Sequence, residues 1–386
     1  MLVYTSVTKS YIPKARVLAK SVKQFHPGWT FVLFLSDSYP EGFQLRDEPF
    51  DKVLTLESLD MPNWRSWAFG HSIVELCTAV KGPAAELLAL EGKDDRIMYL
   101  DPDIKVFASL EPLSALLDHH DILLTPHLLD AEETIGAVRD NEISALKHGI
   151  YNLGFFAART SGQGLEFIRW WSNRLYHFCT DDIPNGLFTD QRWCDLAPGF
   201  FDRLGIVRDR GCNVATWNVA HRPLGKDRDG TLLAGSTPLR FYHFTGYDSG
   251  DGFAMLRKYA SDQHIANEIW DGYRADLNRE GHGESCFQDW KYGSFDDGQP
   301  IFREARMLYR SREDLKQAFP DPYSTAEPSY RRWLESNFTG EWPVQSTRAG
   351  GSGTGTGSLF NPVASRVKFI RKLSKSIRKR LPGYGR

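Results

Sequence analysis

The N-terminal segment, residues 1–37, contains two apolar runs separated by an amphipathic stretch. Leu2–Val7 and Trp29–Asp37 have the composition of buried strands. Between them, Tyr11–Phe25 carries apolar residues at helical spacing, and Pro13 suits the first turn of a helix. A strand, a helix and a strand in this order form a βαβ unit, so the sequence predicts an α/β fold with parallel strand pairing.

A further apolar run, Ile97–Leu100, leads directly into two aspartates, Asp101 and Asp103. The carboxyl end of a strand in an open α/β sheet is where ligands bind. Two carboxylates this close repel each other unless a cation lies between them, and oxygen ligands favour Mg²⁺ or Mn²⁺. The alternative is an Asp-Pro turn that holds no ligand.

The remaining pattern predicts more strands and helices up to residue 249, and a mostly helical or irregular extension over residues 250–346. Gly154 lies inside one of the strands, where a glycine often marks the close approach of a ligand or another backbone. The expected strands are Val53–Leu56, Asp121–Thr125, Tyr151–Ala158 and Leu239–Phe244, and the expected helices are Ser72–Leu90 with an interruption near Gly82-Pro83, Asn141–His148 and Gly164–Cys179.

The net charge of −2 hides a strong asymmetry along the chain. Ten of the 47 Lys and Arg residues follow Thr347, where there is no acidic residue, so all 49 Asp and Glu residues precede it. Residues 347–358 have the composition of a flexible Gly/Ser/Thr linker. Residues 359–386 combine an apolar stripe with many basic side chains, which predicts an amphipathic helix on an anionic membrane surface. The alternatives are a disordered basic tail and a segment that contacts nucleic acid. Of the three, we favour the membrane surface and expect no nucleic-acid partner.

The five cysteines are scattered, odd in number and free of CxxC pairs, which favours a reducing cytosol over a disulfide framework or a zinc site. We expect neither a signal peptide nor a transmembrane helix, because no basic N-terminal region with an apolar core and no run of about 18 apolar residues occurs. The expected location is cytoplasmic, peripherally associated with the inner face of the cell membrane.

Six short motifs occur along the chain in an order that narrows the chemistry. They are the helix beginning at Tyr11, Tyr99-Leu-Asp-Pro-Asp-Ile104, Tyr151-Asn-Leu-Gly154, Thr189-Asp-Gln191, Cys212-Asn-Val214 and His243-Phe-Thr-Gly246. In this order they resemble the retaining GT-A glycosyltransferases of family 8, over about residues 1 to 250. The resemblance implies a Rossmann-like GT-A fold for a nucleotide-diphospho-sugar transferase, with a mixed, mostly parallel sheet flanked by helices.

The resemblance also implies roles for individual residues. It makes Asp101, Asp103 and His243 ligands of Mn²⁺ or Mg²⁺, and it places Asp190 and Gln191 beside the anomeric carbon. Nucleotide-sugar contacts are expected at Thr5, Tyr11, Lys81, Asp101, Asn152, Gly154, Asn213 and Gly246. Of these, the tyrosine is expected to stack on the base.

The chemistry of the residue types is compatible with some of these roles and leaves others open. A histidine is the commonest neutral ligand that could complete an Asp pair, although a lone histidine at a strand end is usually structural. Gln191 cannot act as a general base, but it can hydrogen-bond a sugar or stabilise an oxocarbenium-like centre. Asp190 could bind sugar hydroxyls or act as a nucleophile in a double displacement. The resemblance instead implies attack and departure on the same face, and both routes retain configuration.

The chain departs from the family pattern at three places. Ser6-Val-Thr8 replaces the acidic residue expected before the tyrosine, which weakens the case for uridine as the base. Tyr247-Asp-Ser249 replaces a Lys-Pro-Trp whose lysine would touch the diphosphate, a role that Lys81 or Arg222 could take. The run Tyr292–Arg310 looks like an element of certain bacterial polysaccharide glycosyltransferases, so we place the chain in a divergent bacterial branch.

The sequence therefore predicts a metal-dependent, retaining glycosyltransferase of bacterial surface polysaccharide synthesis. It would transfer a sugar from a nucleotide-diphosphate donor, expected to be UDP-linked, to a glycan or lipid-linked glycan acceptor. One alternative is a haloacid-dehalogenase-type phosphatase, although Lys105 stands where that family needs Thr or Val. The other is a non-catalytic sugar- or membrane-binding protein.

Overall fold

The computed structural model describes residues 1–260 and 264–337. Residue contacts divide the chain into two compact units, Met1–Ser324 and Thr325–Arg386. The second unit contributes one described helix, α15 (Tyr330–Asn337). The predicted linker 347–358 and basic segment 359–386 lie outside the described residues, and the predicted domain limits at residues 249 and 346 stay predictions. Among the described helices, none combines the length and the apolar composition that crossing a lipid bilayer requires.

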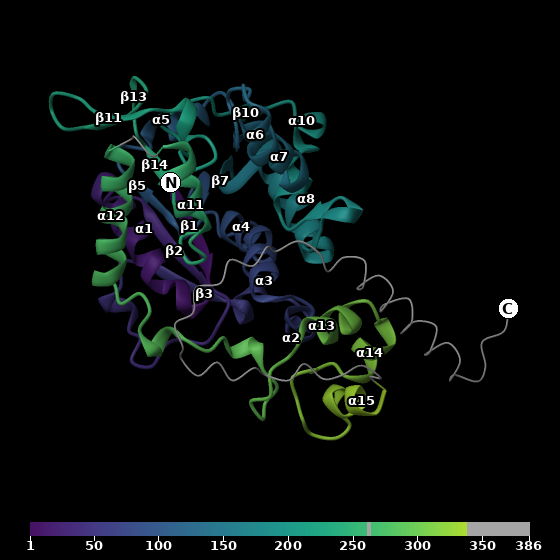
Figure 1. The fold of residues 1–386 in the computed structure, drawn as a ribbon. Helices are drawn as coiled ribbons and strands as arrows, with labels where there is room; N and C mark the ends of the chain where they lie inside the picture. Colours follow the sequence, from purple (N-terminus) through teal and green to yellow (C-terminus); the bar gives the residue numbers. More distant parts are fainter. Residues whose placement is uncertain (261–263, 338–386) are drawn as a thin grey trace. The chain divides into compact units, whose positions relative to one another are not determined.

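The first unit is built on a seven-stranded sheet in the order β10-β6-β7-β4-β1-β2-β3 (Figure 1). All neighbouring pairs are parallel except those of β7, which runs antiparallel to both β4 and β6. This mixed, mostly parallel sheet flanked by helices confirms the predicted fold class. Its strands are β1 (Leu2–Val7), β2 (Thr30–Leu35), β3 (Lys52–Thr55), β4 (Arg96–Leu100), β6 (Ile122–Pro126), β7 (Tyr151–Arg159) and β10 (Leu204–Ile206).

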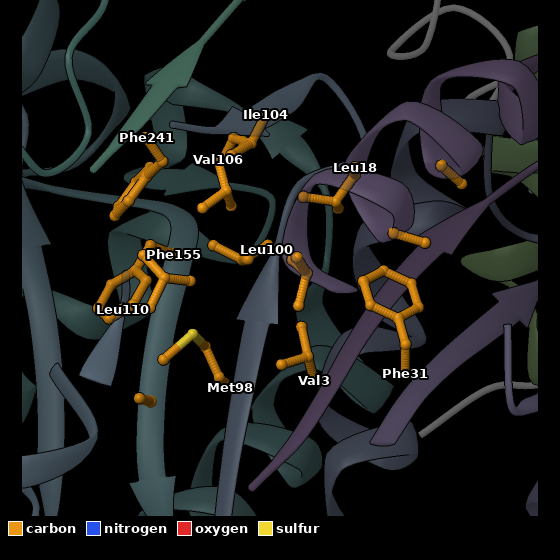
Figure 2. Close-up of a cluster of buried hydrophobic side chains, with 14 of the residues drawn as sticks. Val3, Leu18, Phe31, Met98, Leu100, Ile104, Val106, Leu110, Phe155 and Phe241 are labelled. Carbon is orange, nitrogen blue, oxygen red and sulfur yellow. The ribbon is translucent and has the colours of Figure 1, made fainter. Parts of the chain in front are cut away.

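Both faces of the sheet are covered. Neighbouring residues of a strand point to opposite sides, so each strand contributes side chains to both faces. On one face, Val3, Phe31, Met98 and Phe155 belong to one buried apolar cluster that also contains Leu18 of helix α1 (Ile12–Phe25) (Figure 2). On the other face, the rings of Tyr4, Tyr99 and Phe156 contact one another, and Phe156 meets Trp171 of helix α8. These buried strands are apolar almost without interruption, as expected for a sheet covered on both sides.

The helices of the first unit begin and end close to the predicted residues. The predicted helix Ser72–Leu90 is two helices that meet at Val80, so a helix does start anew near Gly82-Pro83, which lies in the first turn of the second helix. A proline in the first turn costs no hydrogen bond, because the N–H groups there have no helical partner. The helices are α1 (Ile12–Phe25), α2 (Trp64–Phe69), α3 (Ile73–Ala79), α4 (Lys81–Leu90), α5 (Glu111–Leu116), α6 (Ile135–Ala137), α7 (Ile143–His148), α8 (Gly162–Phe178), α9 (Gln191–Cys194), α10 (Ala197–Phe200), α11 (Asp251–Tyr259), α12 (His264–Arg279), α13 (Arg303–Arg310) and α14 (Glu313–Ala318).

Three small sheets accompany the large one. The strand β5 pairs antiparallel with β14, β8 with β9, and β11 with β12, which also pairs with β13. The predicted strand Leu239–Phe244 is β14, shortened to three residues, and its partner follows the two aspartates. The small strands are β5 (Ile104–Val106), β8 (Asp181–Asp182), β9 (Leu187–Phe188), β11 (Leu224–Lys226), β12 (Leu232–Ala234), β13 (Thr237–Pro238) and β14 (Phe241–His243).

Candidate active site

The two aspartates lie in a tight turn between β4 and β5. The turn closes with a hydrogen bond of 3.0 Å from the Ile104 N–H to the Asp101 carbonyl, and the Asp101 N–H donates to the Gly154 carbonyl at 2.8 Å. In the β5–β14 pair, His243 stands directly opposite Ile104. Strand pairing therefore places His243 beside Asp101 and Asp103, although the histidine lies far along the chain.

These three side chains form a convergent ligand group. The Nε2 atom of His243 is 3.1 Å from Oδ1 of Asp103 and 3.7 Å from Oδ2 of Asp101. One ligand atom from each residue lies within 4.8 Å of the others. Two carboxylates and an imidazole offer the oxygen and nitrogen donors that a divalent cation such as Mn²⁺ or Mg²⁺ can accept.

Burial and the neighbouring charges shift the pKa values of Asp103 and His243 in opposite directions. Burial alone would raise the pKa of Asp103, but the facing His243 outweighs it and lowers that pKa to about 2. Burial alone would lower the pKa of His243, but Asp103 and Asp101 raise it above its usual value. The buried Asp103 carboxylate is thus stabilised by a neighbouring positive charge.

The orientation of His243 is set by Asn152 at the start of β7. The Nδ1 atom of His243 donates to Oδ1 of Asn152 at 3.2 Å, and the same oxygen accepts the Gly154 N–H at 3.2 Å. A proton on Nδ1 therefore faces Asn152, and Nε2 is the nitrogen that faces the carboxylates, where it would lose its proton to become a metal ligand. Asn152 can reach this place because β7 is antiparallel to β4, so its beginning lies at the edge where β4 ends.

Lys81 joins Asp101 to Asp190. Its Nζ atom lies 3.1 Å from Oδ1 of Asp101 and 2.8 Å from Oδ2 of Asp190, and it donates to the Leu153 carbonyl at 3.1 Å. Burial opposes the charged amine, but the two carboxylates raise the pKa of Lys81 well above its usual value. Tyr99 adds a hydrogen bond of 2.7 Å from its hydroxyl to Asp101. A buried chain of alternating charges thus connects the ligand group to Asp190.

Gln191 is locked in place by its neighbours. Its Oε1 atom accepts the Leu153 N–H at 3.1 Å and Nδ2 of Asn152 at 3.3 Å, and its Nε2 donates to the His148 carbonyl at 3.4 Å. Asp190 is equally constrained, because Thr189 donates to its second oxygen at 3.0 Å. Burial raises the pKa of Asp190, and Lys81 opposes that rise.

These residues line one cavity of about 630 Å³. Among the predicted site residues, the cavity wall contains Lys81, Asp101, Asp103, Asn152, Asp190, Gln191 and His243. Ser72 and Glu75 at the start of α3, together with Arg303 of α13, also reach the wall. The predicted helical extension therefore contributes to the cavity.

The other predicted residues lie outside that wall. Gly154 is directly beneath His243, and Gly246 adopts a positive φ of 67° in the loop after β14. Thr5 is fully buried, and its hydroxyl has no hydrogen-bond partner among the described residues. Asn213 is fully buried with a left-handed φ of 53°, and neither polar atom of its amide has a partner in the described part of the chain. Unpaired buried polar atoms and a strained backbone are uncommon, and they cluster at functional sites.

Tyr11 belongs to a contact that the sequence did not reveal. Its hydroxyl donates to Oδ2 of Asp248 at 2.6 Å, and the buried Lys14 binds the same oxygen at 2.5 Å. The Lys14 amine also lies 4.0 Å from the centre of the Tyr11 ring. Asp248 stands in the segment that replaces the expected Lys-Pro-Trp, and no motif signalled its partner on α1.

Of the two cations offered as substitutes for that missing lysine, only Lys81 lines the cavity. Arg222 is buried away from the wall, where it donates to the carbonyl of Cys212 at 2.6 Å. Burial lowers the pKa of Arg222 to about 10. Its position indicates a role in fixing the loop between β10 and β11.

Two curated proteins of Bacillus subtilis (strain 168) are similar to parts of the chain, and no family model matches it. The uncharacterized protein YfnF is 26% identical over 162 residues, which are 40% of this chain and 50% of YfnF. The uncharacterized protein YfnD is 33% identical over 101 residues, which are 26% of this chain and 32% of YfnD. The chain thus spans half the length of the first relative and about a third of the second.

Several solved structures of glycosyltransferases are also similar. The galactosyltransferase LgtC, in complex with donor and acceptor sugar analogues, aligns over its whole length with 71% of this chain, at 18% identity and a TM-score of 0.39. GlyE of Streptococcus pneumoniae TIGR4 aligns over 66% of its length with 76% of this chain, at 16% identity and a TM-score of 0.41. Mouse xyloside xylosyltransferase 1 aligns over 97% of its length with 63% of this chain, at 14% identity and a TM-score of 0.34. At these scores, the activity has to be inferred from the geometry of the site itself.

Proposed function

We propose that this chain is a metal-dependent GT-A glycosyltransferase that moves a sugar from a nucleotide-diphosphate donor to a glycan or lipid-linked glycan acceptor. The observation that carries the proposal is the Asp101–Asp103–His243 group, joined through Lys81 to Asp190 and Gln191 in one cavity. With a divalent cation bound, this arrangement would place positive charge for a leaving diphosphate next to polar groups that can hold a sugar. A UDP-linked donor, membership of family 8 and a place in bacterial polysaccharide synthesis are the finer parts of the proposal.

In this proposal Asp101, Asp103 and His243 hold a divalent cation, taken as Mn²⁺. When bound, the cation neutralises the charge that develops on the departing diphosphate. Asn152 keeps the Nε2 atom of His243 directed at the carboxylates, which fixes the ligand geometry. Lys81 holds Asp101 and Asp190 at a set distance, so the ligand group and the sugar-binding groups keep their relative positions.

The geometry favours a positioning role for Asp190 over a nucleophilic one. Both of its oxygens already have partners, one from Lys81 and one from Thr189. Retention of configuration would then come from attack and departure on the same face, with the leaving phosphate oxygen accepting the proton of the acceptor hydroxyl. Azide rescue of Asp190→Ala with formation of a glycosyl azide would instead support a double displacement.

The proposal is tested with the full-length protein and a panel of nucleotide sugars. We expect Mn²⁺-dependent release of nucleoside diphosphate from one donor, abolished by a chelator and by Asp103→Asn, with the product sugar keeping the donor's anomeric configuration. Release that is insensitive to both chelator and substitution would contradict the proposal. Hydrolysis of simple phosphomonoesters without any use of nucleotide sugars would favour the phosphatase alternative.

Membrane association through residues 359–386, and with it a location at the inner face of the membrane, is a separate part of the proposal. It is supported by the apolar stripe and basic side chains in the sequence. Removal of residues 359–386 is expected to release the protein from liposomes that contain anionic lipid while leaving donor hydrolysis intact. Retention on those liposomes would rule out the anchor.

A further inference from the structure

Asn141 has a buried side-chain oxygen that no described residue satisfies. The residue is 4% exposed and lines the same cavity as Lys81 and Gln191, and its Oδ1 atom has no hydrogen-bond partner in the described part of the chain. Buried carbonyl oxygens are nearly always paired, so an unpaired one in a cavity wall calls for a ligand.

The direction of this amide is fixed by its other end. The Nδ2 atom of Asn141 donates to Oε1 of Glu132 at 2.6 Å, and the second oxygen of Glu132 meets Nε2 of His221 at 2.9 Å. The Glu132 side chain is itself 4% exposed. Because the nitrogen is committed to this carboxylate, the oxygen is the atom left for the cavity, and it can only accept a hydrogen bond.

The backbone around Asn141 also has an uncommon conformation. Residues Val138–Glu142 form a π-helical turn between α6 and α7. Such turns insert one extra residue, are rare, and occur frequently at functional sites. Asp140, which also lines the cavity, secures the turn by binding Lys258 and accepting the Tyr259 hydroxyl at 2.6 Å. The Asp140 charge is therefore compensated.

The neighbouring wall residues indicate the chemistry of the occupant. Ser144, His148 and Trp217 line the cavity with Asn141. The Trp217 ring lies 5.5 Å from the ring of His243, which places an aromatic surface next to the ligand group. A hydrogen-bond acceptor in the same cavity wall as a hydroxyl, an imidazole and an indole suits a neutral molecule rich in hydroxyl groups. An anionic group would find no donor at Asn141 Oδ1.

We propose that the π-turn Val138–Glu142 forms the acceptor subsite of the cavity, and that Oδ1 of Asn141 accepts a hydrogen bond from one hydroxyl of a neutral sugar acceptor. This inference rests on the proposed glycosyltransferase function and adds the acceptor's chemical class and a specificity-determining residue to it. Asn141 selects a hydroxyl at one position of the acceptor, because a deoxy sugar would leave the oxygen unpaired.

The test uses the full-length enzyme with its donor, Mn²⁺ and a panel of methyl glycosides with their monodeoxy analogues. We expect Asn141→Ala to lower kcat/KM for the preferred glycoside about tenfold, while hydrolysis of the donor by water stays at the wild-type rate. One monodeoxy analogue should show the same loss with the wild type and no further loss with the variant. The exposed Asn173→Ala serves as the matched control and should leave both rates unchanged.

The outcomes separate this inference from the function on which it rests. Wild-type enzyme that cleaves no nucleotide sugar overturns both. Wild-type enzyme that transfers sugar, with Asn141→Ala unchanged for every glycoside or slowed equally in donor hydrolysis, overturns the acceptor subsite alone. If the melting temperature of Asn141→Ala is well below that of the wild type, Asn141→Ser is used in its place, because the serine hydroxyl can still donate toward Glu132. The same comparison of parent and deoxy glycosides then decides whether the acceptor subsite is correct.

Discussion

Gly154 lies so close beneath His243 that a Cβ atom added to the glycine would stand 2.5 Å from Cε1 of the imidazole and 2.7 Å from Oδ1 of Asn152. The absence of a side chain at this strand position thus leaves room for the ring and for the amide that orients it. The sequence indicated the close approach of a ligand or another backbone at Gly154, and the structure shows two side chains there instead.

Gly154→Ala is therefore expected to displace His243 and weaken Mn²⁺ binding by about 10- to 100-fold, the usual cost of disturbing the groups that orient a ligand. Titration of Mn²⁺ followed by thermal shift or electron paramagnetic resonance measures the change. Gly225→Ala in β11 is the control, because a Cβ there meets no atom within 4 Å. Equal affinity in wild type and Gly154→Ala would contradict the assignment of His243 as a ligand.

Removal of one partner of the Lys81–Asp190 pair should be more harmful than removal of both. Both side chains are buried, so Lys81→Met leaves the Asp190 carboxylate without its cation at a cost of about 3–5 kcal/mol in the free energy of unfolding. Adding Asp190→Asn should restore a substantial part of that loss, which urea unfolding can measure. The exposed ion pair of Lys316 and Glu313 is the comparison, where Lys316→Met should cost less than about 1 kcal/mol. A double variant less stable than Lys81→Met would contradict the predicted coupling.

The ring of Tyr11, more than its hydroxyl, should matter for donor binding. If the ring stacks on the base, Tyr11→Ala should raise the KM for the nucleotide sugar by roughly tenfold or more, since stacking on an aromatic ring is worth about 1–3 kcal/mol per base. Tyr11→Phe loses only the hydrogen bond to Asp248 and should change that KM by less than about threefold. Steady-state kinetics distinguish the two, and equal effects of both substitutions would argue against stacking.

Acid should destabilise the fold in part through His71. Burial, with a smaller contribution from Arg310, lowers the pKa of His71 to about 4, although Glu75 acts in the opposite direction. The unfolded chain takes up this proton near pH 6.5 and the folded chain only near pH 4, so stability falls as the pH drops below 6.5. Between pH 7 and pH 5 the loss from this residue is about 2 kcal/mol.

His71→Asn provides the measurement, because an amide nitrogen can replace the Nδ1 donor to the Trp67 carbonyl. Urea unfolding at pH 7 and pH 5 should show a smaller loss of stability for this variant than for the wild type. An identical loss in both proteins would show that His71 does not take part in the acid response. The partly buried His127, whose pKa is also lowered to about 4 by desolvation, is expected to contribute to the acid sensitivity that remains.

Much of the sheet and the proximity of the candidate metal ligands could be predicted because both depend on short patterns. Ile97–Leu100 is a buried strand in the structure, and the turn at its end holds the two aspartates as expected. The order of motifs placed His243 next to them, and β5–β14 pairing accounts for that proximity. Tyr99 could also have been included, since residues two apart on a strand point to the same side.

Other features have no local signature in the sequence. The helical spacing of residues 141–148 looks the same whether or not a π-turn precedes it, so the special place of Asn141 was not visible. The Lys14–Asp248 ion pair joins residues that lie far apart in the sequence, and nothing near either one identifies the other. Apolar periodicity reports which residues are buried, but it does not report which strand or side chain each will meet.

The distance along the chain between Asp103 and His243 has a thermodynamic consequence. These residues are 140 positions apart, so a cation bound by both would act as a reversible crosslink that closes a loop containing β6, β7 and β10 of the large sheet. The unfolded chain cannot present this pair of ligands together, so binding would favour the folded state. Each tenfold rise in free cation above the dissociation constant would then add about 1.4 kcal/mol to the free energy of unfolding. The heat resistance of the protein would accordingly follow the supply of the metal as well as the quality of its core.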